Sequence, residues 1–373
     1  MKEVRIGLIG TGYIGRCHAI AYAQAPTVFQ LKGKLVKEMV AEINEDLARQ
    51  KAQDFGFNRY TGDWQTLCQD PNIDVVDICA PNYLHKTIAL EAIKHGKHVY
   101  SEKPLALTAS DAREMVAAAE QAGVKTLVGF NYMKNPAAQL AKQIIDRGEI
   151  GDIVHFYGTH NEDYLANPHT PIDWHCVKEL AGLGALGDLA AHIVNMAHYL
   201  VGGIKEVSGD MATVIPVRPD PRDPQTMRSV ENEDQASALV RFESGAMGVI
   251  ETSRIACGRK MGLTFVVTGT RGTISYTQER MAELNVYRHD DDRSRQGFKT
   301  ILIGPEHPNY SAFCVSAGHG FGFNDQKTVE IGELINGIAA DEPLWPDFQE
   351  GLRVSQVLEA IASSAQKRCW VSV

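Results

Sequence analysis

The sequence predicts an α/β protein of two domains: a doubly wound parallel sheet covered by helices, then an α+β domain with a large antiparallel or mixed sheet. Three observations support this fold class. Short β-rich runs alternate with helical segments through about residue 131, strand-like runs separated by turns dominate afterwards, and 373 residues exceed one ordinary core. We therefore expect domains over 1–131 and 132–373.

In the first domain, apolar runs rich in β-branched residues predict strands, and amphipathic segments between them predict crossover helices. Asp63 precedes a short segment and predicts a capped helix. The predicted strands are Arg5–Ile9, Met39–Ile43, Val75–Cys79, His98–Tyr100 and Thr126–Phe130, and the helices are Tyr13–Ala23, Glu45–Phe55, Leu84–His95 and Thr108–Ala122.

The second domain has a different pattern, in which strands are frequent and helices few. Two charged stretches, 217–234 and 288–296, are typical of segments that leave a sheet. The alternatives for each are a lid or an arm that reaches another subunit, but solvated loops are favoured. The predicted strands are Ile153–His160, Ala236–Phe242, Met247–Glu251, Leu263–Thr268 and Glu283–Tyr287, and the helices are Ala137–Arg147, Leu186–Tyr199, Gln326–Ala339 and Phe348–Ala365.

A glycine turn follows the first strand. In Gly10-Thr-Gly12-Tyr13-Ile14-Gly15, the first glycine allows a tight turn, the second lets backbone amides approach phosphates, and the third lets the helix pack closely on the strand. The helix N-terminus then offers free N–H groups to an anion. The turn predicts a dinucleotide site that includes Tyr13 and Ile14.

Glu42 ends the second strand, where an acidic residue accepts the ribose hydroxyls of a dinucleotide. It lies 27 residues after Gly15, which is longer than usual and which we attribute to an insertion at 26–34. Ile43, Asn44 and Glu45 follow, and none of them neutralises a 2′-phosphate. NAD is therefore favoured over NADP.

Composition excludes several classes of function. The formal net charge of −9 disfavours nucleic acid or an anionic membrane as the main partner. The first strand begins by about Val4 without a signal-peptide pattern, and the seven cysteines form no Cys-x-x-Cys pair. A reduced cytoplasmic protein is the simplest account. The histidines around Cys176 match no zinc spacing, so no metal site is expected.

Two constellations predict chemistry. Lys103 follows the fifth strand and precedes Pro104, which holds its backbone extended. Asp188 and His192 lie four residues apart on one helix face, after a glycine-rich lead-in that we expect to pass close to a ligand. A carboxylate at this position orients an imidazole or raises its basicity. The alternative interpretation is purely structural: Lys103 is then a surface lysine, Asp188 an acidic residue in the first turn of its helix, and His192 a buried histidine.

Taken in order, these motifs resemble the glucose–fructose oxidoreductase, inositol dehydrogenase and MocA family over essentially the whole chain. The resemblance rests on the glycine turn, Glu42, Val76-Asp-Ile-Cys-Ala-Pro81-Asn82-Tyr-Leu-His85, Glu102-Lys103-Pro104, Gly129-Phe-Asn131-Tyr-Met-Lys134-Asn-Pro136 and Gly187-Asp188-x-x-x-His192. It implies a Rossmann domain, then a mostly antiparallel open sheet that often forms subunit contacts in a homodimer or homotetramer.

The resemblance also implies site residues. Lys103, Asp188 and His192 carry catalysis, and Pro81, Asn82, His85 and Glu102 line the nicotinamide cofactor. Polar and aromatic residues in the second domain suit a polyhydroxylated substrate, because amides and carboxylates bind hydroxyls and rings pack on C–H faces. The substrate-binding candidates besides the catalytic three are Lys134, Asn161, Asp163, Tyr164 and Trp174.

These inferences predict an NAD-dependent dehydrogenase that oxidises a secondary ring hydroxyl of a monosaccharide, anhydrosugar or inositol. His192 is the general base, and Lys103 stabilises the alkoxide. Two alternatives remain: NAD-dependent glycoside hydrolysis, and a non-catalytic dinucleotide sensor. The isomer of the Lys103–Pro104 peptide bond is not predictable from sequence.

Overall fold

A computed structural model describes residues 1–373, and the chain forms two compact units. The first comprises Met1–Lys134 and Gly322–Arg353, and the second Asn135–Phe321 and Val354–Val373. The sequence analysis expected one continuous second domain over 132–373. That expectation misses the return of 322–353 to the first unit, where an apolar helix is needed to complete the core.

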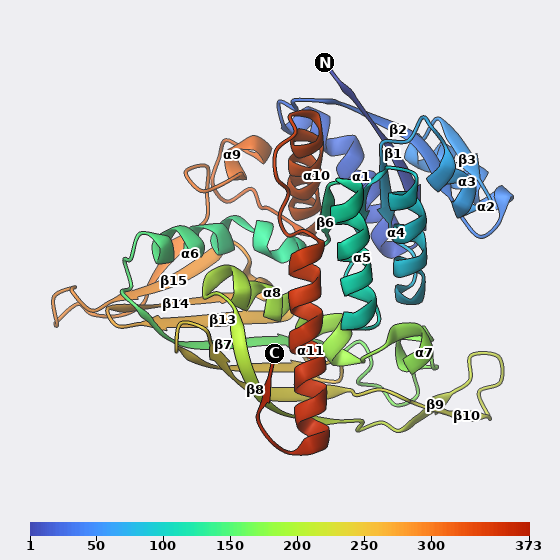
Figure 1. Ribbon diagram of the computed structural model, residues 1–373. Coiled ribbons are helices and arrows are strands. Elements are labelled where there is room, and N and C mark those ends of the chain that lie inside the picture. The colour runs from blue at the N-terminus through green and yellow to red at the C-terminus, as the bar shows by residue number, and fades with distance from the viewer. The chain divides into compact units, whose positions relative to one another are not determined.

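The first unit contains a six-stranded parallel sheet in the order β3-β2-β1-β4-β5-β6. Strand order reverses beside β1, and ligands bind such sheets beyond the carboxyl ends of the strands at this point. The strands are β1 (Glu3–Ile9), β2 (Lys34–Ala41), β3 (Arg59–Thr61), β4 (Val75–Ile78), β5 (His98–Ser101) and β6 (Thr126–Val128) (Figure 1).

Helix ends in the first unit follow local capping chemistry. Asn44, Asp63 and Thr108 accept backbone N–H groups at the starts of α2, α3 and α5, and Gly56 and Gly123 end α2 and α5 in the left-handed conformation. The crossover elements are α1 (Tyr13–Val28), α2 (Glu45–Phe55), α3 (Trp64–Gln69), η1 (Asn82–Leu84), α4 (His85–Lys94), α5 (Ala109–Ala122) and η2 (Asn131–Lys134).

Helix α1 is longer than predicted. It continues through Pro26 to Val28, and β2 begins at Lys34. The expected insertion at 26–34 therefore consists of the last residues of α1 and the connection over 29–33. The prediction ended the helix at Ala23 because an internal proline removes one backbone hydrogen bond; packing against the rest of the unit outweighs that local cost.

Helix α10 (Phe323–Ala339) lies beside α1, and both belong to the first unit (Figure 1). Its apolar residues join the strand residues of the main core. Tight packing of this kind contributes most of a helix's stability in a folded protein. The α10 residues in this core are Ile331, Leu334, Ile335 and Ile338.

The second unit contains a nine-stranded sheet in the order β16-β15-β14-β13-β7-β12-β11-β8-β17, in which only β7 and β12 pair in parallel. The predicted fold class is confirmed. The strands are β7 (Ile153–Asn161), β8 (Ile204–Ala212), β11 (Gln235–Phe242), β12 (Met247–Ser253), β13 (Gly262–Gly269), β14 (Gly272–Thr277), β15 (Glu283–Arg288), β16 (Lys299–Leu302) and β17 (Val371–Ser372).

One face of this sheet packs against helices and the other is open. Exposed and buried residues alternate along β11, as expected for a half-buried strand. Helices α6 (Pro136–Asp146) and α8 (Ala191–Leu200) cover the buried face (Figure 1). The remaining helical elements are η3 (Trp174–Cys176), α7 (Lys178–Ala181), η4 (Leu186–Ala190), η5 (Gln278–Arg280), α9 (Tyr310–Phe313) and α11 (Phe348–Lys367).

The helical stretch Lys178–Leu200 is long and apolar enough to cross a membrane by length and composition alone. However, 78% of its most apolar window is buried inside the structure. A core helix of a globular unit has this property.

The two charged stretches differ in burial. Residues 288–296 are mostly exposed, as predicted. Residues 217–229 contain the hairpin of β9 (Val217–Pro219) and β10 (Met227–Ser229), but Asn232, Glu233 and Asp234 are buried. The solvated-loop prediction is wrong for 232–234, because the Asp234 carboxylate meets the buried Arg254 guanidinium at 2.9 Å.

The Arg254–Asp234 ion pair predicts a stability effect. Replacing Arg254 with Met leaves the Asp234 carboxylate buried without its cation, so we expect the free energy of unfolding to fall by about 3–5 kcal/mol. Chemical denaturation measures the loss. The matched control is Arg259→Met, because Arg259 pairs with Glu279 at the surface. In this variant we expect the free energy of unfolding to fall by less than about 1 kcal/mol. Equal losses in the two variants would contradict a structural role for the buried pair.

Candidate active site

The glycine turn has the geometry of a phosphate cradle. Gly10 has φ 91°, and a Cβ on Gly15 would lie 2.1 Å from the Gly10 carbonyl oxygen. A side chain is therefore excluded at both positions. A Cβ on Gly12 would meet no atom within 4 Å, so the space beside the turn is open. Gly12 is the N-cap of α1 and provides no side-chain cap, which leaves helix N–H groups available to an anion.

Glu42 lies directly beside this turn. Its Oε1 accepts hydrogen bonds from the Thr11 N–H at 2.7 Å and the Thr11 hydroxyl at 2.6 Å, and its Oε2 accepts the Ile43 N–H at 3.0 Å. The sequence reasoning missed Thr11 as the residue that fixes this carboxylate. A negative charge held at the end of β2 suits ribose hydroxyls and repels a 2′-phosphate. Tyr13 is 76% exposed at the start of α1.

The residues after β4 fall into two groups. Pro81 and Asn82 are at least partly exposed, at the start of η1. His85 is 1% exposed, and its ring nitrogens lie 2.9 Å from the Pro104 carbonyl and 2.8 Å from the Ala80 carbonyl. Burial lowers the pKa of His85. The His85 ring therefore lies between the backbone after β4 and the backbone after β5, and its contact with a cofactor stays a prediction.

The Lys103–Pro104 peptide bond is cis, and Lys103 is partly exposed. The preceding residue differs from the prediction. Glu102 is 6% exposed, and its carboxylate contacts His18, Lys327 and the Lys103 N–H. The carboxylate is directed into the unit, because buried cations there offset its desolvation. Its predicted place beside a cofactor stays a prediction.

In the second unit, Asp188 lies in a π-helical turn, η4, that leads directly into α8 and His192. The prediction was a continuous α-helix. Single π-turns occur frequently at functional sites. The glycine-rich segment before Asp188 was predicted to pass close to a ligand, but Gly184 is required by packing within the unit. A Cβ on Gly184 would lie 2.0 Å from the Glu233 carbonyl oxygen. The lead-in therefore passes close to buried backbone of the same unit.

Segment 232–234 holds the start of this helical stretch. The Glu233 carboxylate accepts the Leu186 N–H at 2.9 Å, and its backbone carbonyl accepts the Ala185 N–H at 3.0 Å. Burial raises the pKa of Glu233. No local pattern in the sequence pairs residue 233 with residue 186, so sequence reasoning missed this contact.

Asp188 has an aromatic partner. The Tyr164 hydroxyl donates a hydrogen bond to Asp188 Oδ2 at 2.8 Å. Burial and the Asp188 carboxylate raise the pKa of Tyr164, so the phenol stays protonated and donates at neutral pH. His192 is 5% exposed, and its ring lies 5.6 Å from the ring of His160. The structure thus brings Tyr164 and Asp188 into contact, and His192 follows Asp188 on the same helical stretch.

His160 is a site neighbour that the sequence analysis did not select. Its Nδ1 donates to the Leu189 carbonyl within η4 at 2.8 Å, and its Nε2 lies 3.2 Å from Glu162 Oε1. It comes from the β7 face that packs against the helices. Asn161, the selected neighbour, lines a hollow on the open face together with Ser237 and Glu251. Successive strand residues point to opposite faces, so Asn161 lies on the face opposite to His160, and its substrate contact stays a prediction.

The other substrate candidates have different surroundings. Trp174 is partly exposed and stacks on His175 with ring centroids 3.7 Å apart. The Asp163 carboxylate is held by the Lys260 ammonium at 2.7 Å, and a hydrogen bond from this lysine lowers the pKa of Asp163. Lys134 belongs to the first unit, is 3% exposed and pairs with Glu333 at 2.5 Å. Its ammonium is thereby engaged within the unit, which does not fit the predicted substrate contact.

Comparison with known proteins decides the family. Residues 4–130 match the model of the oxidoreductase family with an NAD-binding Rossmann fold, and residues 138–275 match the GFO/IDH/MocA C-terminal domain. The chain belongs to this oxidoreductase family. The family resemblance stated from the sequence motifs is confirmed.

Individual family members match over the full chain. Levoglucosan dehydrogenase of Pseudarthrobacter phenanthrenivorans is 38% identical over 100% of this chain and 99% of the relative. A solved levoglucosan dehydrogenase in complex with NADH and levoglucosan has a TM-score of 0.97 at 39% identity, with 100% and 99% of the chains covered. An NAD binding oxidoreductase from Klebsiella pneumoniae has a TM-score of 0.96 at 46% identity, with the same coverage.

Glu42 predicts the cofactor preference of this family member. Glu42→Ala removes a fixed carboxylate acceptor, so we expect NAD⁺ affinity to fall about tenfold or more, as for a lost charged hydrogen bond. NADP⁺ affinity should fall less, because a repelling charge is removed as well. Fluorescence titration with NADH and NADPH measures both. Asp54→Ala, an exposed change in α2, is the control, and equal selectivity in the two variants would refute this role for Glu42.

Proposed function

We propose that this protein is an NAD-dependent dehydrogenase that oxidises a secondary ring hydroxyl of an anhydrosugar, a monosaccharide or an inositol. The full-length similarity to a levoglucosan dehydrogenase supports the anhydrosugar class first. The observation that carries the proposal is the fixed Tyr164–Asp188 contact in the π-turn that leads into His192. It gives the second unit a polar site with an aromatic wall.

The first unit suits NAD by its own geometry. The open cradle at Gly12, the uncapped start of α1 and the fixed Glu42 carboxylate match the pyrophosphate and the adenosine ribose. Bound NAD⁺ would supply the hydride acceptor. In this proposal Gly10, Tyr13, Ile14, Gly15, Pro81 and Asn82 belong to the same binding region, and residues 1–131 are the core of the cofactor domain.

The remaining chemistry is assigned to three side chains. His192 takes the hydroxyl proton, because an imidazole titrates near neutral pH. Asp188, itself held by Tyr164, favours the protonated ring electrostatically. Lys103 donates to the substrate oxygen, where negative charge develops as hydride leaves. The sugar-facing surface is assigned to the partly exposed Trp174 and Tyr164.

A substrate screen tests the proposal. NADH formation at 340 nm is followed with levoglucosan, glucose and the inositols at alkaline pH. Turnover of at least one of these is expected, and no turnover of any would reject the proposed class. Release of an aglycone from a glycoside without NADH accumulation would instead indicate NAD-dependent glycoside hydrolysis.

Variants of the assigned side chains test the mechanism. Lys103→Met and His192→Ala should each lower kcat by about 10²–10⁴-fold, because each removes a group that acts on the reacting oxygen or its proton. The dissociation constant for NADH, measured by fluorescence, should stay near the wild-type value. Turnover at the wild-type rate in either variant would remove that residue from the mechanism.

A second copy of this chain is the proposed partner, as a homodimer or homotetramer through the open face of the nine-stranded sheet. The open face carries Leu239 and Met247, which are 48% and 47% exposed. Exposed apolar side chains on one sheet face favour association. We also propose a cytoplasmic location, because all seven cysteines are free thiols.

The sheet-face proposal predicts a change in mass. Leu239→Glu/Met247→Glu places two carboxylates on the open face, so we expect the oligomer to dissociate towards monomer in light scattering. Lys51→Glu, on the surface helix α2 of the first unit, should leave the mass unchanged. A wild-type monomer, or an unchanged oligomer in the double variant, would exclude this interface.

A further inference from the structure

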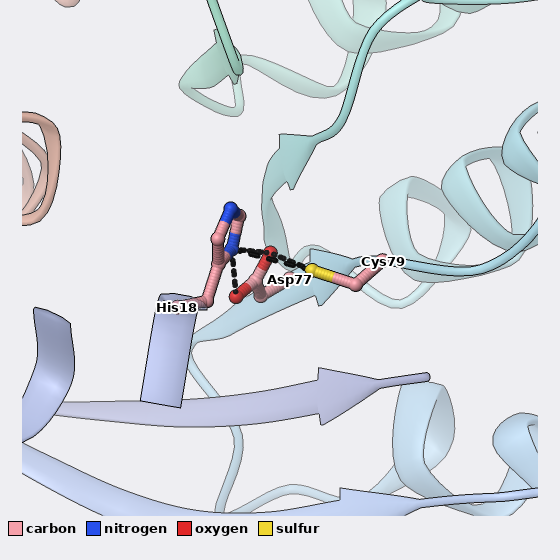
Figure 2. A group of neighbouring side chains, drawn as sticks. All are labelled: His18, Asp77 and Cys79. Atoms are coloured by element: carbon pink, nitrogen blue, oxygen red, sulfur yellow. Dashed lines mark hydrogen bonds and ion pairs between the residues drawn. The ribbon is translucent and has the colours of Figure 1, made fainter. Parts of the chain in front are cut away.

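The interior of the first unit contains a network of ionisable side chains that the proposed mechanism does not use. Its members come from α1, β4, the end of β5 and α10. Figure 2 shows three of them, with His18 of α1 pointing at Asp77 of β4 and Cys79 beside both. All are buried. The network consists of His18, Tyr22, Asp77, Cys79, Tyr100, Glu102, Lys327 and Glu330.

His18 is an imidazolium by geometry. Its Nδ1 lies 2.9 Å from Asp77 Oδ2, and its Nε2 lies 3.0 Å from Glu102 Oε1. Because a carboxylate only accepts, both nitrogens donate, and this requires the doubly protonated ring. Burial lowers the pKa of His18, but the Asp77 carboxylate outweighs burial and raises the pKa to about 9. His18 thus links α1, which begins at the phosphate-binding turn, to Glu102.

Lys327 supplies the second cation. It is fully buried on α10, and its Nζ lies 2.5 Å from Glu102 Oε1 and 3.1 Å from Glu330 Oε2. Tyr100 donates to the same Glu330 oxygen at 2.8 Å. Burial raises the pKa of Glu330. Two buried cations, His18 and Lys327, thus meet the buried carboxyl groups of Asp77, Glu102 and Glu330.

The space around Glu102 is shaped for its carboxylate. A Cβ on Gly129 would lie 2.4 Å from Glu102 Oε1, so a larger residue at that position would displace the carboxylate. The other carboxylate oxygen, Oε2, accepts the backbone N–H of Lys103 at 3.2 Å. The Glu102 side chain, which Lys327 and His18 hold, therefore accepts a hydrogen bond from the backbone of the next residue, Lys103.

We propose that Lys327 is a positioning residue that holds the Lys103 peptide through Glu102. The inference rests on the proposed function, because Lys103 is the residue that stabilises the alkoxide there. A lysine that must place its charge against one substrate oxygen needs a fixed main chain, and an error of 1 Å costs about 10²-fold in rate. The α10 helix thus serves the reaction from 225 residues away.

A metal ion at His18, Asp77 and Cys79 is the competing use of these side chains, since their donor atoms lie within 4.8 Å of one another. The protonation states oppose it. A doubly protonated imidazole has no lone pair for a metal, and burial with the nearby carboxylates raises the pKa of the Cys79 thiol. The network is therefore assigned to positioning.

The test compares two buried lysines of the first unit. Lys327→Met in the full-length protein should lower kcat by about 10²-fold, with KM for the sugar and the dissociation constant for NADH near wild type. Amide hydrogen exchange of residues 101–105 should become faster. The matched control is Lys97→Met: Lys97 is 7% exposed, and its ammonium caps the Asp70 and Ile73 carbonyls before β4 begins. It should lower the thermal midpoint while kcat and exchange at 101–105 remain unchanged.

Each result decides the proposal. Wild-type kcat and exchange in folded Lys327→Met would overturn it, as would equal losses in both lysine variants, which would indicate general destabilisation. If Lys327→Met does not fold, Glu102→Gln keeps the side-chain shape, removes the charge and is measured in the same way. Hydrogen exchange needs no substrate, so the positioning effect is measured even if the screened sugars are not turned over.

Discussion

The neutralisation of buried charge is the constraint on which the first unit depends. Glu102 sits where a parallel sheet presents residues to a ligand, yet its carboxylate turns inwards to meet Lys327 and His18. A carboxylate without these partners would carry a desolvation penalty of several kcal/mol. One set of ion pairs therefore joins three parts of the unit, which are the Glu102–Lys103 segment, helix α1 and helix α10.

The second unit solves a similar problem with a different pair. Arg254 and Asp234 are both buried, and Arg254 also donates to the carbonyl of His175. The adjoining Glu233 holds the start of the π-turn that carries Asp188. In both units, buried charged groups hold the segments that carry the residues to which the proposed function assigns the reaction.

Sequence reasoning predicted local structure correctly where that structure depends on near neighbours in the chain. The glycine turn and the helix caps are local, and Glu42 follows its strand directly. It failed where the partner is distant: nothing near Glu102 announces Lys327, and nothing near Lys134 announces Glu333. The choice between His160 and Asn161 depends on a second factor, because a displacement of one residue along a strand exchanges the two faces of the sheet. The role of α10 in the first core is likewise absent from local patterns.

The discontinuity of the first unit affects the order in which the protein is made. Residues 1–134 emerge from the ribosome long before α10. Until the chain has passed residue 339, the main core lacks four of its apolar residues and Glu102 lacks Lys327. Eight strands of the nine-stranded sheet lie within 135–321 and are synthesised in that interval, and only β17 follows α10. An incomplete half that exposes apolar surface is prone to aggregation. Completion of the dinucleotide half is therefore a late event in biosynthesis, although its sequence comes first.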